Sequence, residues 1–581
     1  MHMDYVQLTI PFEGALRSDE MSDRGGKFQD VTMTAAPTAN YGEVFTRRWI
    51  VEAILDLVGY TADKPLYEQR LVEPSIGSGA FLIPAVERLI ASAHRDGVPL
   101  HRLAGAIRGF DIQPEHVEGC RTQVAAVLER EGCSEASHLA NTWISRADFL
   151  HGPREQNADY VVGNPPYIRT ENLDAESDAD YRKRWPTMRG RADIYVGFYE
   201  RGLSLLKPRG RLGFICADRW MRNQYGKALR EFVTDGFAVE HVWTMHDVDA
   251  FETEVSAYPA ITVLSHNVQG KVVVADAGAD FAEASARELV TWSLRQDYSS
   301  AKGVGFSAHR LQSWFDGRDY WPTGDPARLR LVDFLAKNFR PLSDPATGTR
   351  VSIGVASGAD SDYVVTDRSI VESDRLLPMS MVRDLQSGKF RWSGHYLVNP
   401  WGPDGRLVAL DDYPALSRYL SNRPAIRRRY VARKNPNTWY RTIDRVDPTL
   451  VDRPKLLLQD MRTTINPVLE PGGYYPHHNL YYIVSDEWDL EVLGGLLLSE
   501  IAQAYIEAFC VKMRGGTLRF QAQYLKRVPV PNMSDFCPEV EAALRDAFRA
   551  RDVEGATIAA CRAYGISAAG LTPTFDLKDS A

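Results

Sequence analysis

Short apolar runs alternate with amphipathic stretches between about residues 70 and 265. Four consecutive segments show the rhythm: LVEPSIGSG (71–79), FLIPAVERLIASAH (81–94), AIRGFDI (106–112) and PEHVEGCRTQVAAVLER (114–130). Three later runs are typical of buried strands: DYVVGNPP (159–166), RLGFICA (211–217) and AYPAITVLS (257–265). Strand and helix alternating in this way predict an α/β fold with a doubly wound, Rossmann-like parallel sheet, in which ligands bind at the carboxyl ends of the strands.

The rhythm weakens after residue 270, and the composition becomes rich in arginine, aromatics and turn residues after residue 350. The expected organisation is a flexible tail (1–40), the sheet domain (41–270), a connecting segment (271–349), a mixed α+β domain (350–535) and a helical C-terminal tail (536–581). The apolar run from Leu490 to Phe509 contains glycines and polar residues, so it is expected to be a buried helix and not a membrane span.

Composition narrows the class of protein without naming it. Of 581 residues, 68 are Lys or Arg and 76 are Asp or Glu, a net charge of −8, which argues against a surface coated in basic charge but not against one basic cleft. The six cysteines form no C-x-x-C pair, which suits a reducing cytosol, and the N-terminus has no secretory pattern. A cytoplasmic protein is expected.

The run at 71–79 ends in a turn that suits a ligand. Gly77 and Gly79 would let the backbone turn tightly and approach a bound group, although the same pair could serve only as a turn. Asp111 ends the next strand, where a carboxylate can accept hydrogen bonds from two ribose hydroxyls. Because the third glycine of the dinucleotide fingerprint is missing, another adenosine-containing ligand is favoured over a dehydrogenase cofactor. Asp148 and Phe149 could bind an adenine amino group and its ring.

The segment Asn164-Pro165-Pro166-Tyr167 is the strongest signal in the chain. Two prolines stiffen the end of a buried strand, so the Asn164 side-chain oxygen and the Pro165 carbonyl can point at one spot. Two convergent acceptors would bind both N–H groups of an exocyclic amine and free its lone pair to attack an electrophilic methyl group. Tyr167 would stack on a planar substrate. The alternative is a turn that only ends a strand.

With the glycine segment E-P-x-x-G-x-G upstream, NPPY resembles the S-adenosylmethionine-dependent amino-methyltransferases, and more narrowly the gamma-class N6-adenine DNA methyltransferases of the TaqI type. The resemblance runs from about Tyr41 to Pro531. It implies a catalytic domain followed by a target-recognition domain, with S-adenosylmethionine as cofactor and double-stranded DNA as partner. The implied cofactor contacts are Thr46, Glu73, Pro74, Ile76, Gly77, Gly79, Asp111, Ile112, Asp148, Phe149 and Asn164. The implied catalytic residues are Asn164, Pro165, Pro166, Tyr167 and Phe251, with Phe251 on the second face of a flipped adenine. The family often has Thr-Pro-Pro where this chain has Thr46-Arg47-Arg48.

A basic, aromatic segment favours DNA as the substrate. Arg418 to Lys455 holds eleven Lys or Arg against three Asp, a local net charge of +8 that would neutralise phosphates, although a solvated basic surface is the alternative. The residues expected to contact DNA are Arg427, Arg428, Arg429, Arg433, Lys434, Trp439, Tyr440, Arg441, Arg514 and Arg519. The segments 353–365, 472–484 and 514–531 resemble recurring parts of the gamma-class target-recognition domain.

Other functions stay open on the sequence alone. Methyltransferases of RNA or of protein glutamine share NPPY, and a non-catalytic DNA-binding defence subunit could keep the fold. No nuclease motif is visible, so any paired restriction endonuclease is expected to be a separate protein. His477 and His478 lack a surrounding set of Cys or carboxylate ligands in the sequence, so no metal site is expected there.

Overall fold

A computed structural model describes residues 45–152, 157–252, 258–295, 298–510 and 518–566. The chain divides into an N-terminal unit that ends at Arg330 and a C-terminal unit that begins at Leu331. The expected tail at 1–40 lies outside the described residues.

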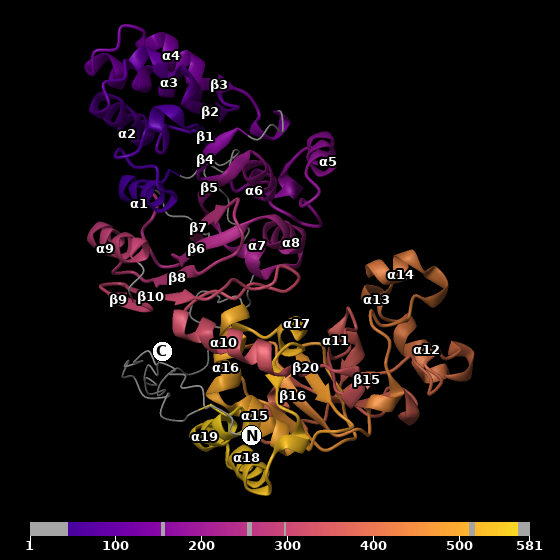
Figure 1. The fold of residues 1–581 in the computed structure, drawn as a ribbon. Helices are drawn as coiled ribbons and strands as arrows, with labels where there is room; N and C mark the ends of the chain where they lie inside the picture. The colour runs from indigo at the N-terminus through magenta and orange to yellow at the C-terminus, as the bar shows by residue number, and fades with distance from the viewer. Residues whose placement is uncertain (1–44, 153–156, 253–257, 296–297, 511–517, 567–581) are drawn as a thin grey trace. The chain divides into compact units, whose positions relative to one another are not determined.

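The N-terminal unit is built on one ten-stranded sheet (Figure 1). Its strands, in spatial order, are β3 (Ile144–Arg146), β2 (Ile107–Asp111), β1 (Leu71–Glu73), β4 (Ala158–Gly163), β5 (Leu206–Ala217), β7 (Pro259–Ser265), β6 (Ala238–Thr244), β8 (Val272–Ala277), β10 (Phe306–Leu311) and β9 (Ser300–Gly303). The strands from β3 to β5 are parallel, whereas β7 runs antiparallel to both β5 and β6. The carboxyl ends of β1, β2 and β4 therefore meet at one edge.

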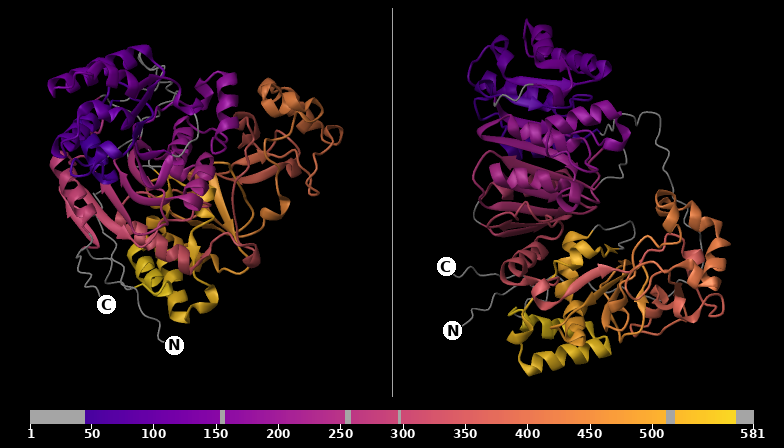
Figure 2. Two further views of the ribbon diagram at one scale, coloured as in Figure 1. Left: turned by 45° about the horizontal axis from the view of Figure 1, so that its top comes forward. Right: turned by 90° about the vertical axis from the view of Figure 1, so that its right-hand side faces the viewer.

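Helices cover both faces of this sheet (Figures 1 and 2). They are α1 (Arg48–Val58), α2 (Leu82–Arg95), α3 (Pro114–Arg130), α4 (Ala136–Trp143), α5 (Ala175–Arg184), α6 (Tyr195–Ser204), α7 (Arg219–Arg222), α8 (Lys227–Gly236) and α9 (Glu283–Leu294). Neighbouring residues of β1 show the layering, because Leu71 packs into the core with α1, α2 and α9 while Val72 packs into the core with α6 and α8. The α/β class expected from the sequence is confirmed.

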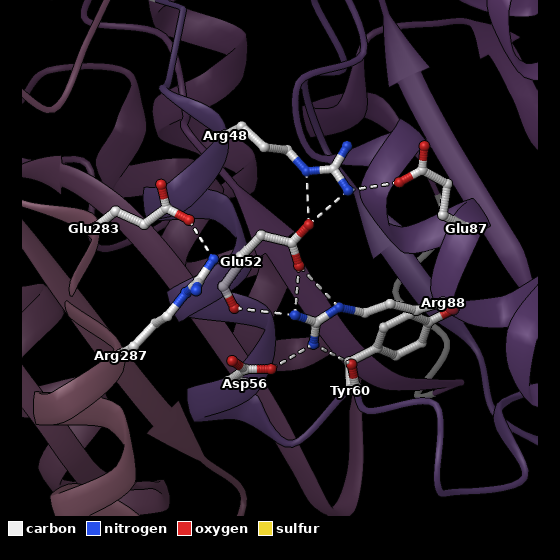
Figure 3. Close-up of polar contacts among 8 residues, drawn as sticks. All are labelled: Arg48, Glu52, Asp56, Tyr60, Glu87, Arg88, Glu283 and Arg287. Carbon is white, nitrogen blue, oxygen red and sulfur yellow. Dashed lines mark hydrogen bonds and ion pairs between the residues drawn. The ribbon is translucent and has the colours of Figure 1, made fainter.

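Charged residues join α1 to α2 (Figure 3). Arg48 pairs with Glu52 on its own helix and with Glu87 on α2, at 2.6 and 2.5 Å. Arg88 of α2 pairs in return with Glu52 and Asp56, at 2.5 and 2.7 Å. Single exposed pairs add little stability, but this network shares partners across two helices and fixes where α1 begins.

The sheet extends past the boundary expected at residue 270. Strand β8 pairs in parallel with β6, β10 pairs with β8, and β9 forms the edge. The expected connecting segment (271–349) therefore contributes three strands and α9 to the N-terminal unit. Short strands added at a sheet edge depend on long-range pairing, which weakens their local signal.

The C-terminal unit has mixed α and β structure. One four-stranded sheet contains β12 (Arg350–Ile353), β20 (Leu480–Val484), β16 (Lys455–Gln459) and β18 (Val468–Glu470). A second contains β13 (Val364–Val365), β15 (Tyr396–Val398), β14 (Leu376–Ser380) and β19 (Tyr475–Pro476). Two-stranded pairs are formed by β11 (Arg340–Pro341) with β22 (Pro529–Val530) and by β17 (Met461–Arg462) with β21 (Leu518–Arg519). The helices include α11 (Asp360–Tyr363), α12 (Pro414–Ser421), α13 (Pro424–Arg428), α14 (Tyr430–Lys434) and α17 (Ala522–Leu525), while α10 (Pro326–Asn338) spans the boundary between the units.

The apolar run at 490–509 forms two helices, not the single helix expected. They are α15 (Leu490–Leu498) and α16 (Glu500–Phe509), bent by 66° where the Ser499 side chain caps α16 by accepting from the Ala502 N–H. In the described residues no single helix is long and apolar enough to cross a membrane, and these two pass such a test only as a bent pair. Helices α18 (Pro538–Ala550) and α19 (Val553–Ala563) pack on α15, so the expected C-terminal tail belongs to this unit.

Candidate active site

The glycine turn after β1 is held in place by the neighbouring strand. Gly77 has φ of 49° and Gly79 has φ of 91°, conformations that glycine adopts without strain. A Cβ on Gly79 would also lie 3.0 Å from the Cys120 sulfur. The Gly77 N–H donates to the Asp111 carboxylate at 3.0 Å. The turn therefore brings the carboxyl ends of β1 and β2 together.

Two carboxylates of different character lie at this edge. Asp111 accepts backbone hydrogen bonds from Gly77 and Gln113 and is 9% exposed. Glu73 is 1% exposed, and its Oε2 accepts no hydrogen bond from any described residue. Burial, with a smaller effect of the Asp111 charge, raises the pKa of Glu73 well above its usual value. A cationic ligand group would satisfy this buried carboxyl.

These groups open onto a cleft at the carboxyl edge of the sheet. The residues expected from the sequence that line it are Thr46, Glu73, Pro74, Ile76, Gly77, Asp111, Ile112, Asp148, Phe149, Asn164, Pro165 and Pro166. Gly79, Tyr167 and Phe251 do not line it. The cleft thus joins most of the expected cofactor positions to the expected catalytic corner, although the role of each residue stays a prediction.

Several residues of the cleft were not anticipated, among them Phe45, Ser75, His116, Ile168, Tyr181, Ile194 and Phe198. Tyr181 lies on α5, a polar helix with no buried residue, and nothing in the sequence pattern marks it. Phe198 was detectable only as one apolar position of α6. Tyr181 and Phe198 both line the cleft, because α5 and α6 lie in the connection between β4 and β5.

The Asp148–Phe149 pair forms one wall of the cleft. The Asp148 carboxylate accepts from the Leu150 N–H and from the Tyr181 hydroxyl, both at 2.8 Å, and it contacts His151 Nδ1. Phe149 stacks on Phe198 with ring centroids 5.4 Å apart. Asp148 is thus already engaged, while Phe149 is 2% exposed, with the Arg201 guanidinium 4.1 Å from the centre of its ring.

The end of β4 and the two prolines after it form a corner at Asn164, Pro165 and Pro166, called here the Asn164 corner. It is held from two sides. The Ser75 hydroxyl donates to the Asn164 backbone carbonyl at 3.1 Å, which ties the corner to the glycine segment. The Asn164 side-chain nitrogen donates to the Thr46 hydroxyl oxygen at 3.2 Å. The ring of Tyr167 is half-buried with its hydroxyl buried, and it meets Tyr195 edge to face at 6.4 Å. The corner is therefore held by contacts to its backbone and its side chain; Asn164 and Pro165 line the cleft, with Asn164 Oδ1 buried.

Phe251 differs from its expected placement. It is 6% exposed and packs within the core shared with α1 and α9, because its backbone bridges antiparallel to Thr46. The structure therefore does not present this ring to the cleft, and its stacking on a base stays a prediction. The next residues, 253–257, lie outside the described residues.

The basic segment separates into exposed and structural residues. Arg428, Arg433 and Lys434 are exposed, and Arg427 lies 3.6 Å from the centre of the Trp439 ring. Arg429 is half-buried, and its expected contact with DNA stays a prediction.

The guanidinium of Arg429 donates to the carbonyls of Ser357, Trp439 and Arg441 and to the Tyr363 hydroxyl. These bonds tie the basic segment to α11.

One aromatic residue and three arginines complete the expected DNA contacts. The Tyr440 hydroxyl donates to the Val408 carbonyl at 2.8 Å, so this end of the side chain is engaged within the unit. Arg441 is half-buried, with its guanidinium 5.8 Å from the Trp401 ring. Arg514 and the side chain of Arg519 lie outside the described residues.

The histidine pair has a carboxylate neighbour that the sequence did not reveal. His477 Nε2 lies 3.0 Å from Asp360, and His478 Nδ1 lies 3.6 Å from the same oxygen, so the sequence argument that no carboxylate is near was wrong. The Asn479 N–H donates to His477 Nδ1, so the proton of the neutral ring is on Nε2, where it donates to Asp360. A metal ligand needs a free lone pair on that atom, so this hydrogen-bond pattern favours a polar bridge between α11 and the segment that joins β19 to β20.

Comparison with known proteins defines the class. The Eco57I restriction-modification methylase family matches residues 106–251. A solved structure of the Type IIL restriction-modification enzyme MmeI in complex with DNA superposes with a TM-score of 0.54 at 12% identity, covering 90% of this chain and 74% of that chain. The fold is thus that of restriction–modification methyltransferases.

Two Type II methyltransferases are more similar to this chain in sequence than MmeI is. The Type II methyltransferase M.PaeR7I of Pseudomonas aeruginosa is 42% identical over 533 residues, 90% of this chain and 92% of the relative. M.XhoI of Xanthomonas vasicola is 40% identical over 91% of this chain and 98% of its own length. The chain belongs to the family of Type II methyltransferases. The resemblance drawn from its glycine and NPPY motifs is confirmed at this level.

Proposed function

We propose that this protein transfers a methyl group from S-adenosylmethionine to N6 of an adenine flipped out of double-stranded DNA, as the modification enzyme of a restriction–modification system. The observation that carries the proposal is that the Asn164 corner opens onto the same cleft as Glu73 and Asp111. A donor and an acceptor bound there would meet at the carboxyl edge of the sheet. The family membership supports the reaction class.

The residues of the cleft suit the parts of S-adenosylmethionine, which supplies an electrophilic methyl group on sulfur. The buried carboxyl of Glu73 fits an α-ammonium group, and Asp111 fits the ribose hydroxyls. Phe149 offers a ring surface, and Asp148 lies beside it as an acceptor for an adenine amino group. The buried, unsatisfied Oε2 of Glu73 supports this fit most directly.

On the acceptor side, the chain provides positioning and charge stabilisation. Asn164 Oδ1 and the Pro165 carbonyl would accept the two N–H bonds of the target amine, which localises the nitrogen lone pair for attack on the methyl group. The amine proton is lost after transfer, because a methylated ammonium attached to an aromatic ring is strongly acidic. No covalent enzyme intermediate is needed.

Extrusion of the base from the duplex costs a few kcal/mol, which stacking and phosphate contacts would offset. Tyr167 is proposed to stack on the extruded base, and the exposed charges of Arg428, Arg433 and Lys434 are proposed to bind phosphates. The charge of this segment and the match to a restriction-modification methylase family favour DNA over RNA or protein glutamine. Any endonuclease would be a separate chain.

The test is transfer of tritiated methyl from S-adenosylmethionine to duplex DNA, with RNA and a protein glutamine substrate as parallel arms, followed by nucleoside analysis. N6-methyladenine in DNA is expected, and Asn164→Ala should abolish it while retaining DNA binding. A product in RNA or protein, or a different methylated base, would overturn the assignment. Wild-type rates in Asn164→Ala would overturn the role of Asn164.

A further inference from the structure

Thr46 contacts the side chain proposed to hold the target amine. Its hydroxyl oxygen accepts from Asn164 Nδ2 at 3.2 Å, and Thr46 is 3% exposed. The Asn164 backbone is held separately by Ser75. The Thr46 bond therefore acts on the orientation of the carboxamide, which the backbone contact leaves able to rotate.

The orientation of this carboxamide decides its chemistry. A carboxamide has an acceptor at one end and two N–H donors at the other, with almost the same shape. With Nδ2 of Asn164 directed at Thr46, Oδ1 is the opposite end of the carboxamide, the end to which the proposed function assigns an N–H of the target amine. A carboxamide that rotates about its side-chain bonds would meet that amine with the wrong group or at the wrong angle for part of the time.

Thr46 is itself fixed by a second segment of the chain. It forms an antiparallel bridge with Phe251, in which the Arg47 N–H donates to the Ala250 carbonyl at 3.0 Å. The Arg47 side chain pairs with Asp249 at 2.6 Å. The arginine that stands where the family often has proline thus ties the segment before α1 to the segment that ends in Phe251.

The ion pairs between α1 and α2 hold the other side of the backbone that carries Thr46. Helix α1 begins at Arg48, directly after Arg47, and Arg48 is paired with Glu52 and Glu87 (Figure 3). The hydroxyl of Thr46 is therefore presented from a backbone that is held on both sides. Such preorganisation is what a hydrogen bond needs in order to restrain a catalytic side chain.

We infer that the Thr46 hydroxyl positions the Asn164 carboxamide for methyl transfer, in place of the cofactor contact that the family resemblance implies. The inference rests on the proposed function, because it needs Asn164 to accept from the target amine. It makes the segment from Asp249 to Phe251 part of the support of the catalytic corner.

The experiment compares Thr46→Val and Thr46→Ser with the wild type in single-turnover methylation of duplex DNA. Valine keeps the shape but loses the acceptor, so a rate 10- to 100-fold lower is expected, a size typical of misplaced catalytic groups. Serine keeps the hydroxyl and should stay within about threefold of the wild type. Thr262→Val is the matched control, because Thr262 is equally buried and bonds to Tyr199 within the core.

Binding measurements separate the possible causes. The dissociation constants for S-adenosylhomocysteine and for DNA should be unchanged in Thr46→Val, so that the loss is confined to the chemical step. A wild-type rate in Thr46→Val, or a loss matched by equally weakened cofactor binding, would overturn the inference. Absence of adenine methylation by the wild type itself would instead refute the proposed function.

Discussion

The Tyr181 hydroxyl donates to the Asp148 carboxylate across 2.8 Å, and this bond joins α5 to the wall of the cleft. Helix α5 has no buried residue of its own, and Tyr181 is partly buried against the core that contains Phe149. His151 strengthens the attachment by lying between Asp148 and Asp180 of α5. A polar helix is thus connected to the residue expected to bind an adenine amino group.

We expect Tyr181→Phe to weaken cofactor binding. Loss of one hydrogen bond, worth about 0.5–1.5 kcal/mol, corresponds to a two- to tenfold higher dissociation constant for S-adenosylhomocysteine by calorimetry. Tyr67→Phe is the matched control, because Tyr67 also donates to an aspartate, Asp96, but at an exposed site. Equal effects of the two substitutions, or no effect of Tyr181→Phe, would contradict this role.

The raised pKa of Glu73 should make cofactor affinity depend on pH. In the free protein the carboxyl keeps its proton to a higher pH than usual, whereas a bound ammonium group favours the carboxylate, so binding releases a proton below that raised pKa. Affinity should therefore rise with pH up to the raised pKa and level off above it.

Titration of S-adenosylhomocysteine binding from pH 5 to 8 checks this expectation. Glu73→Gln should bind S-adenosylhomocysteine more weakly at neutral pH and lose the pH dependence of that binding. Glu118→Gln, at an exposed position of α3, should behave as the wild type. A pH-independent affinity in the wild type would rule out a proton-coupled role for Glu73.

Arg428 and Arg433 should contribute to DNA affinity through charge alone. Each is exposed, and each replacement by alanine should weaken binding of all sequences about equally and reduce the salt slope by about one. Fluorescence anisotropy at several salt concentrations measures both quantities. Lys337→Ala, at an exposed site in α10, is the control, and an unchanged salt slope in both arginine variants would place the DNA elsewhere.

Arg429 should instead contribute to stability. Its guanidinium satisfies three backbone carbonyls and the Tyr363 hydroxyl, so Arg429→Ala should lower the free energy of unfolding by about 2 kcal/mol. Chemical denaturation measures this, with Arg428→Ala as the neighbouring control. Full stability with reduced DNA affinity in Arg429→Ala would restore the role expected from the sequence.

The strands that build the cleft were predictable because their signals are local. The apolar runs ending at Glu73, Asp111 and Gly163 are short and are bounded by turn residues, and each ends at the shared edge of the sheet. Side chains placed one or two residues after such strands must meet at that edge. Strands β8 to β10, which extend the sheet to its β9 edge, escaped the same reasoning, because their place in the sheet depends on pairing with strands distant in the sequence.

The amino-acid sequence by itself determined the alternating architecture, the glycine turn and the Asn164 corner, since each depends on residues adjacent along the chain. Only the tertiary structure decided that Phe251 is buried against Thr46, that Arg429 supports its own domain and that Asp360 meets His477. These contacts join residues 12 to more than 200 positions apart. Local propensity does not encode which distant partner saturates a hydrogen bond or covers a ring, because that choice is made by the packing of the whole core.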